Sequence, residues 1–323
     1  MATDRKVDGT IYDLIIVGLG PAGLSAAIYA ARAGLNVLAL EQGSLGGKLI
    51  TIDQLENYPG EPAISGSDLA DKMLKQITDL HVPYKLQSVQ GTANLESEIK
   101  QVITRRVIYQ TKSIIFATGT KERELGIDYE LDLRGHGISY CAVCDGRFYK
   151  DKDVIVIGGG NSAFAASTYL SRYVKSVKQV LRRDVARADF VEVERVKQNP
   201  KVKLYYNLLA DSVLLTDAID GEKSVCGLRF KERLTGEYVD LAADGVFAMV
   251  GELANSKYLQ DANGQNLLDK NNYVVTDFNM QSKMPGVFAA GDVRNTNLRQ
   301  VVTACADGAI AAQMAQRYIA SLD

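Results

Sequence analysis

The 323-residue sequence predicts an α/β fold with two Rossmann-like dinucleotide-binding domains, the second inserted into the first. Two observations predict this fold. An apolar run that ends in a glycine-rich turn and continues into a helical stretch occurs first at 11–33 and again at 154–173. Short apolar runs bounded by glycine are typical of strands buried on both faces, and their alternation with helices indicates parallel sheets.

Length and composition limit the class of protein. A chain of 323 residues can form two domains, each with its own core. Its formal net charge of −2 gives no bulk attraction to nucleic acid or anionic lipid. No apolar run approaches the roughly 18 residues that a membrane span needs, and residues 1–8 lack the apolar region of a secretory signal. We therefore expect a cytoplasmic protein that binds neither nucleic acid nor membrane.

The first unit carries a nucleotide-binding fingerprint. A strand-like run at 11–17 precedes Gly18-Leu19-Gly20-Pro21-Ala22-Gly23, a helical stretch follows to 33, and a second apolar run covers 37–40. The glycines let the backbone approach a pyrophosphate, and the helix N-terminus supplies amide donors. Glu41 closes the second strand, where its carboxylate can accept hydrogen bonds from ribose hydroxyls. The plainer alternative is a tight strand–helix turn beside an unrelated glutamate.

The remaining elements place the domain boundaries. Hairpin strands are predicted at 99–104 and 106–111, and a separate strand at 114–116 ends in Ala117-Thr118-Gly119. A second hairpin is predicted from 225–234 and 238–241, around a glycine turn, and a helix from 301 to the end. We expect the first domain to comprise 1–121 and 252–323, and the inserted domain to comprise 122–251.

Five segments occur in the order found in low-molecular-weight thioredoxin reductases and resemble the FAD-contacting segments of that family. They are Gly18 to Gly23, Gly46-Gly47-Lys48-Leu49, Glu56-Asn57-Tyr58-Pro59-Gly60, Ala117-Thr118-Gly119 and Gly286-Val287-Phe288-Ala289-Ala290-Gly291-Asp292. The resemblance covers nearly the whole chain and implies FAD, two three-layer β/β/α domains and a homodimer. It also implies that Asp292 binds the ribityl chain, that Asn57 lines the flavin pocket, and that Arg299-Gln300-Val301 pass beside the isoalloxazine.

The inserted domain contains the one close cysteine pair, Cys141-Ala142-Val143-Cys144. Structural disulfides are rare in a reducing compartment, so this pair needs a chemical reason. A two-residue spacer lets two sulfurs reach disulfide distance, and a dithiol of this kind can take two electrons from a reduced flavin and pass them on by disulfide exchange. Asp145 could protonate or deprotonate the thiol that faces the flavin.

Two different interpretations of the pair stay open at this point. It could be half of a zinc site, although the remaining candidate ligands, His81, His136, Cys226 and Cys305, are scattered. It could also be a packed pair without chemistry. The flanking Gly137–Tyr140 and Asp145-Gly146 resemble the active-site stretch of thioredoxin reductases, which implies that Cys144 lies nearer the flavin and that Cys141 attacks the partner's disulfide.

The inserted domain contains a second glycine-rich turn. Gly158-Gly159-Gly160-Asn161-Ser162-Ala163 follows one predicted strand, and Arg182, Arg183 and Arg187 follow the next. Guanidinium groups at this position suit the 2′-phosphate of NADPH, because they bind phosphate oxygens in a fork. The alternative is a solvated basic strand end. Leu181, Ala165, Ala166 and Ala254 depart from the residues usual in the family and leave the electron donor open.

The resemblance implies a thioredoxin-disulfide reductase. Electrons would pass from NADPH through FAD to the Cys141–Cys144 disulfide and on to a separate thioredoxin-like protein. The main rival is a ferredoxin-dependent, NADPH-independent flavin disulfide reductase of the same fold. Two more distant rivals are a ferredoxin or flavodoxin reductase without a redox disulfide, and a flavin-binding protein without turnover. No metal is expected.

Overall fold

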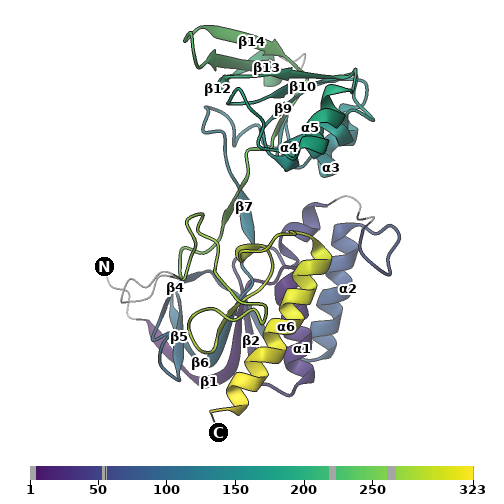
Figure 1. Ribbon diagram of the computed structural model, residues 1–323. Helices are drawn as coiled ribbons and strands as arrows, with labels where there is room; N and C mark the ends of the chain where they lie inside the picture. Colours follow the sequence, from purple (N-terminus) through teal and green to yellow (C-terminus); the bar gives the residue numbers. More distant parts are fainter. Residues whose placement is uncertain (1–4, 53–54, 56, 218–222, 260–266, 323) are drawn as a thin grey trace. The chain divides into compact units, whose positions relative to one another are not determined.

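The computed structural model describes residues 5–52, 55, 57–217, 223–259 and 267–322 (Figure 1). The chain divides into two compact units: residues 1–121 with 253–323 form the first unit, and residues 122–252 form the second. The chain passes between the units within β7 (Thr120–Glu122) and β16 (Glu252–Ala254), which pair with each other. The second unit is therefore inserted into the first.

The first unit is built on a sheet with the order β3-β2-β1-β6-β5-β4, in which β17 also pairs with β6. Strands β1, β2, β3, β6 and β17 run parallel, whereas β5 and β4 are antiparallel to their neighbours. The strands are β1 (Lys6–Val17), β2 (Val37–Glu41), β3 (Tyr84–Leu86), β4 (Val89–Ala93), β5 (Lys100–Thr104), β6 (Val107–Phe116) and β17 (Val287–Ala289).

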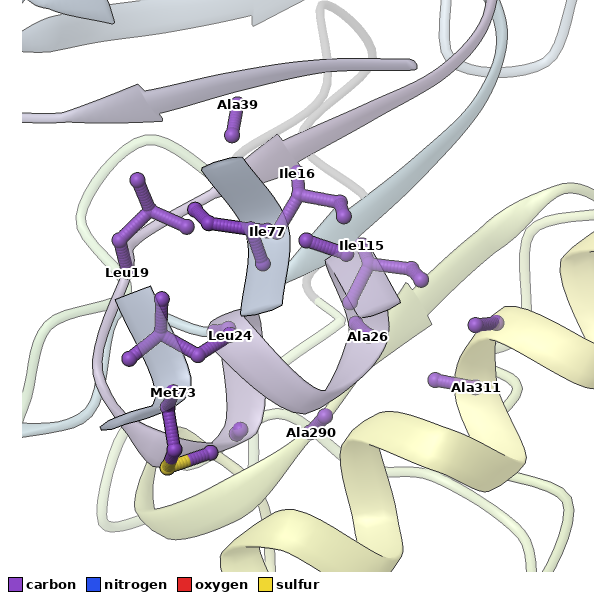
Figure 2. Close-up of a cluster of buried hydrophobic side chains, with 14 of the residues drawn as sticks. Ile16, Leu19, Leu24, Ala26, Ala39, Met73, Ile77, Ile115, Ala290 and Ala311 are labelled. Carbon is purple, nitrogen blue, oxygen red and sulfur yellow. The ribbon is translucent and has the colours of Figure 1, made fainter. Parts of the chain in front are cut away.

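Three helices cover one face of this sheet: α1 (Pro21–Arg32), α2 (Gly66–Asp79) and α6 (Val301–Ala320) (Figure 1). Because side chains alternate along a strand, Ile16 and Ile115 face these helices while their neighbours Ile15 and Ile114 face the other side. Figure 2 shows Ile16 and Ile115 beside Ala26 of α1. On the opposite face, apolar side chains of β4, β5 and the start of β6 complete a second core.

The second unit has three layers. A parallel sheet has the order β11-β10-β9-β15-β8, and a separate antiparallel sheet has the order β12-β13-β14. Ile155 and Val246 of the parallel sheet pack against Leu228 and Phe230 of the antiparallel one, and Val154 packs on the helical side. This β/β/α arrangement, together with the insertion, confirms the predicted α/β fold class.

The elements of the second unit and the short 3₁₀ helices have the following bounds. They are β8 (Ile138–Ser139), β9 (Asp153–Ile157), β10 (Ser176–Val180), β11 (Val202–Tyr205), β12 (Leu208–Asp217), β13 (Lys223–Glu232), β14 (Tyr238–Ala242), β15 (Gly245–Ala248), α3 (Ala142–Asp145), α4 (Asn161–Leu170), α5 (Phe190–Lys197), η1 (Gly47–Thr51), η2 (Gly146–Tyr149) and η3 (Gly291–Val293).

One predicted break is wrong. The sequence predicted separate strands at 106–111 and 114–116, but the structure has one strand, β6. Ser113 is fully buried and its hydroxyl donates to the carbonyl of Gly286 at 2.9 Å, while the Thr111 hydroxyl donates to the Ser113 carbonyl at 2.8 Å. Hydrogen bonds thus satisfy the polar groups of Thr111 and Ser113 inside a continuous strand.

Candidate nucleotide and redox sites

The carboxyl ends of four strands meet at one edge of the first-unit sheet. Val17 is paired with Leu40 of β2 and with Phe116 of β6, and Phe116 is paired with Ala289 of β17. Glu41 is the last residue of β2, and the segments Gly18–Gly23, Ala117–Gly119 and Gly291–Asp292 follow β1, β6 and β17. The parallel register therefore brings together three of the five predicted FAD segments and Glu41, at the edge where open α/β sheets bind ligands.

The glycine loop between β1 and α1 packs closely against the segment that follows β6. Gly18 has a φ of +100°, and a Cβ on it would lie 2.4 Å from the carbonyl oxygen of Ala117, so no side chain fits there. Helix α1 begins after Gly20 with Pro21 at its first position, and no side chain caps it. The uncapped helix start and the positive end of the helix dipole suit an anionic group.

Glu41 is fixed beside this loop. Its side chain is buried; Oε2 accepts a hydrogen bond from the Leu19 N–H at 2.7 Å, and Oε1 accepts one from the Gly43 N–H at 2.8 Å. A carboxylate has about four lone-pair positions, so each oxygen keeps capacity for a second donor. The side chain is therefore oriented by the backbone and can still accept hydrogen bonds from ribose hydroxyls.

Two predicted flavin-pocket residues are brought into contact although they are 243 positions apart. The side-chain amide of Asn57 donates to Oε1 of Gln300 at 2.9 Å, and Val301 then begins α6. The Arg299 guanidinium lies 4.4 Å from the centre of the Tyr273 ring. Its Nε is buried without a hydrogen-bond partner in the described structure, an arrangement that costs about 1–3 kcal/mol unless a bound group accepts from it. The residues present thus fit a polar, planar cofactor.

The remaining predicted FAD residues have their own supports. Lys48 donates from Nζ to the Thr120 hydroxyl at 2.9 Å, and it follows Gly46 and Gly47 beside the buried Leu49. The Asn255 side chain donates to the Thr118 carbonyl at 3.0 Å, and the Thr118 hydroxyl donates to the Asn255 carbonyl at 2.6 Å. Glu56, which belongs to one of the resembling segments, lies outside the described residues.

Sequence reasoning missed Asp307. Its Oδ2 accepts hydrogen bonds from the Gly291 N–H at 3.1 Å and from Nη1 of Arg294 at 3.0 Å, and both charged side chains are largely buried. This ion pair fixes η3, the turn that contains Asp292. A signal was available in the sequence, because Asp307 is an acidic residue within an otherwise Ala-rich helical stretch.

The second unit repeats the sheet-edge arrangement. Gly158 follows β9 with a φ of +151°, and a Cβ on it would lie 2.3 Å from the Met249 carbonyl oxygen. Helix α4 begins after Gly160 without a side-chain cap and includes Asn161, Ser162 and Ala163. A second pyrophosphate could therefore bind at this turn.

Three exposed arginines follow β10 beside that turn. Arg182 and Arg183 come directly after the buried Leu181, and the Arg187 N–H donates to the Gly159 carbonyl at 2.6 Å. Asn161 and Asp189 exchange two hydrogen bonds, of 3.0 and 2.7 Å. The sequence did not predict Asp189, which fixes the arginine segment to the start of α4.

The cysteine segment lies between β8 and β9. Cys141 is disulfide-bonded and directly precedes α3, whereas Cys226 and Cys305 are free thiols. The Asp145 N–H donates to the Cys141 carbonyl at 3.1 Å, which places the predicted proton-transfer residue one turn beyond Cys141. The side chain of Cys144 lies outside the described part of the structure, so its pairing with Cys141 stays a prediction.

Metal ligands do not cluster within the described ranges: no group of three or more His, Cys, Asp or Glu side chains there is placed to hold a metal ion. Every helix in the described part of the chain is too short or too polar to cross a membrane.

Comparisons with known proteins agree with this geometry. Residues 12–308 match the family model described as pyridine nucleotide-disulphide oxidoreductase. Thioredoxin reductase from Listeria monocytogenes is 40% identical over 322 residues, covering 100% of this chain and 97% of the relative. The crystal structure of Lactococcus lactis thioredoxin reductase matches with a TM-score of 0.77 and 35% identity, covering 96% of this chain and 99% of that one. A ferredoxin-flavin thioredoxin reductase from Clostridium acetobutylicum is less similar, at 25% identity and a TM-score of 0.53 over 97% and 99% of the two chains.

Proposed function

The chain belongs to the pyridine nucleotide-disulphide oxidoreductase family, and we propose that it is an FAD-dependent thioredoxin-disulfide reductase that uses NADPH. The observation that carries this proposal is the disulfide at Cys141, in the same unit as the second glycine turn. Neither a ferredoxin or flavodoxin reductase nor a flavin protein without turnover would pass electrons through such a disulfide.

FAD would be held in the first unit. The Gly18–Gly23 turn would bind the pyrophosphate, Glu41 the ribose hydroxyls, and Asp292 with Arg299 the flavin part. The uncapped start of α1 supports the first role, and the Arg299 Nε, which has no hydrogen-bond partner among the described residues, supports the last. Bound FAD supplies two-electron transfer between a nicotinamide and a disulfide. The protein's part is to orient the cofactor and to carry the electrons onward as thiols.

The thiol chemistry would proceed by disulfide exchange. With the pair reduced, the Cys141 thiolate attacks one sulfur of the partner's disulfide, which breaks that bond and forms a mixed disulfide. The Cys144 thiolate then attacks the Cys141 sulfur, which restores the Cys141–Cys144 disulfide and releases the partner as a dithiol. Asp145 would move the proton at the Cys144 sulfur.

NADPH would be held in the second unit. The turn at Gly158–Ala163 would bind its pyrophosphate, and the arginines at 182, 183 and 187 would bind its 2′-phosphate. The thioredoxin reductases are closer to this chain than the ferredoxin-flavin enzyme, which favours NADPH as the donor. A thioredoxin-like partner, a homodimer and a cytoplasmic location stay predictions.

Anaerobic mixing tests the donor. The flavin-loaded protein is mixed with NADPH, and in parallel with NADH, while the visible absorption of the oxidised flavin is followed. Rapid bleaching by NADPH, with slow bleaching by NADH, is the expected result. A protein that is bleached by dithionite or by reduced ferredoxin, but not by NADPH, would instead be a ferredoxin-dependent disulfide reductase.

A further inference from the structure

A buried carboxylate holds the residue that precedes Cys141. Glu130 is only 3% exposed, and its oxygens accept hydrogen bonds from the backbone N–H groups of Leu125 at 2.7 Å and Gly126 at 2.8 Å. Its Oε1 also accepts a hydrogen bond of 2.6 Å from the Tyr140 hydroxyl. Burial, and then the neighbouring Glu130, raise the pKa of Tyr140, so the phenol keeps the proton that it donates.

The Tyr140 ring is held from a second direction. The Arg134 guanidinium lies 4.8 Å from the ring centre, and Nη2 of Arg134 is 3.1 Å from the Glu122 carboxylate. A cation at this distance from an aromatic face is attracted to the ring. Tyr140 is thus fixed at its hydroxyl and over its ring.

A serine holds the backbone of Cys141 itself. The Ser139 hydroxyl accepts a hydrogen bond from the Cys141 N–H at 3.0 Å and donates one to the Cys141 carbonyl at 3.2 Å. Ser139 is 3% exposed and is paired with Phe247 in the parallel sheet, so it belongs to the rigid part of the unit. The Asp145 N–H donates to the same carbonyl. These three bonds fix the backbone of Cys141 and leave its sulfur to the disulfide.

We propose that Ser139, Tyr140 and Glu130 are positioning residues that hold the Cys141 backbone in the geometry of its disulfide and thereby lower the reduction potential of that disulfide. We call these three residues the Cys141 clamp. The inference deepens the proposed function and rests on it for the identity of the reacting disulfide.

The direction of the effect follows from conformational entropy. Reduction breaks one S–S bond and adds two electrons and two protons, and it removes the covalent restraint on the segment. If other contacts already fix the backbone, it gains little conformational entropy when the S–S bond breaks. The two thiols then stay close together and re-form the disulfide readily. Without the clamp the dithiol state gains freedom, so reduction becomes easier.

Equilibration with a reference dithiol measures this directly. Wild-type, Ser139→Ala and Tyr140→Phe proteins, all flavin-loaded, are equilibrated anaerobically with mixtures of reduced and oxidised dithiothreitol. In this reaction the protein disulfide becomes a dithiol while dithiothreitol becomes its cyclic disulfide. Thiols are trapped by alkylation after acid quenching and counted by peptide mass spectrometry. We expect Ser139→Ala to raise the equilibrium constant for reduction roughly threefold to tenfold, tenfold being about 30 mV. Tyr140→Phe should act in the same direction and more weakly.

Matched variants separate positioning from general stability. Ser212→Ala removes a hydroxyl of the same unit that bonds Asp211, and it should leave the equilibrium constant unchanged. Ser139→Thr keeps a hydroxyl and should restore the wild-type constant. Unchanged constants in both Ser139→Ala and Tyr140→Phe, with thermal unfolding like that of the wild type, would overturn the inference. The assay contains neither NADPH nor thioredoxin, so a wrong donor or partner in the proposed function would leave its outcome intact.

Discussion

Arg294 and Asp307 form a largely buried ion pair of 3.0 Å, and the same Asp307 oxygen accepts the N–H of Gly291, which precedes the predicted FAD residue Asp292. The pair therefore joins the final long helix to the turn that would contact the cofactor. Because both side chains are largely buried, removing either one would leave the other charge without a counter-charge and with little water to solvate it. The pair is therefore expected to stabilise the fold.

Replacing Asp307 by alanine should destabilise the protein and weaken FAD binding. Removing one partner leaves Arg294 buried without its counter-charge, a change that costs about 3–5 kcal/mol. Urea unfolding and flavin titration of the apoprotein measure the two effects. Asp79→Ala provides the control, because Asp79 pairs with Lys75 on the exposed side of α2 and should change stability by less than about 1 kcal/mol. Equal effects of the two substitutions would contradict this role.

Lys100 should make stability rise with pH in the alkaline range. Its side chain is fully buried; Nζ donates to the carbonyls of Ser97 and Lys112 and to the Tyr318 hydroxyl. Burial lowers the pKa of Lys100 from 10.5 to about 8, against the opposing charge of Glu98. Between these two values the unfolded chain binds more protons than the folded one, so the free energy of unfolding increases with pH across that window.

Lys100→Met should remove this dependence, while Lys75→Met, at an exposed position, should preserve it. Because tyrosines and thiols titrate in the same range, the difference between each variant and the wild type is the quantity to compare. Urea unfolding between about pH 8 and about pH 10 gives the slopes. Parallel pH profiles for wild type and Lys100→Met would show that the lysine is not responsible.

Arg187→Gln should raise the KM for NADPH but not the KM for NADH. Loss of a charged hydrogen bond to a phosphate costs about 1.5–3 kcal/mol, which corresponds to a rise in KM for NADPH of roughly tenfold to a hundredfold. Steady-state reduction of a thioredoxin with each nucleotide measures it. Arg195→Gln alters an exposed arginine of α5 that pairs with Glu192. This control should leave the KM values for NADPH and NADH unchanged. A matching rise for NADH after Arg187→Gln would argue against 2′-phosphate recognition.

Serine at Cys141 or Cys144 should abolish thioredoxin reduction while the flavin is still bleached by NADPH. Each substitution removes one sulfur of the proposed exchange pathway and leaves the first-unit cofactor site unaltered. Insulin precipitation coupled to thioredoxin, alongside anaerobic absorbance, separates the two half-reactions. Cys226→Ser is the matched control, since that thiol is free. Retained thioredoxin reduction in both active-site variants would disprove the disulfide route.

The sequence predicts well those features that depend on neighbouring residues. The turns at Gly18 and Gly158 were predicted because strand, glycines and helix follow one another directly, and the structure places both at sheet edges. Strand β6 was predicted as two pieces. The prediction failed because Ser113 is buried against Gly286, a contact between residues that are distant in the sequence.

Buried polar partners were harder to predict. Glu130 resembles a surface acid in the sequence, and only the fold shows that four neighbouring N–H and O–H groups donate to it. Asn255 contacts Thr118 across 137 positions, and Asp307 contacts Gly291 from within an Ala-rich helix. No local pattern contains such pairings, because they arise from packing between distant segments.

The pairing of β6 with both β1 and β17 has a consequence for biosynthesis. The turn after β1 leaves the ribosome early, whereas Asp292 and α6 emerge only after the whole inserted unit. That unit is complete before β17 exists and can fold while the first unit still lacks a strand. The cofactor site at the edge of the first-unit sheet can then form only after β17 and α6 have been translated. Cofactor binding would therefore occur late in the synthesis of the chain.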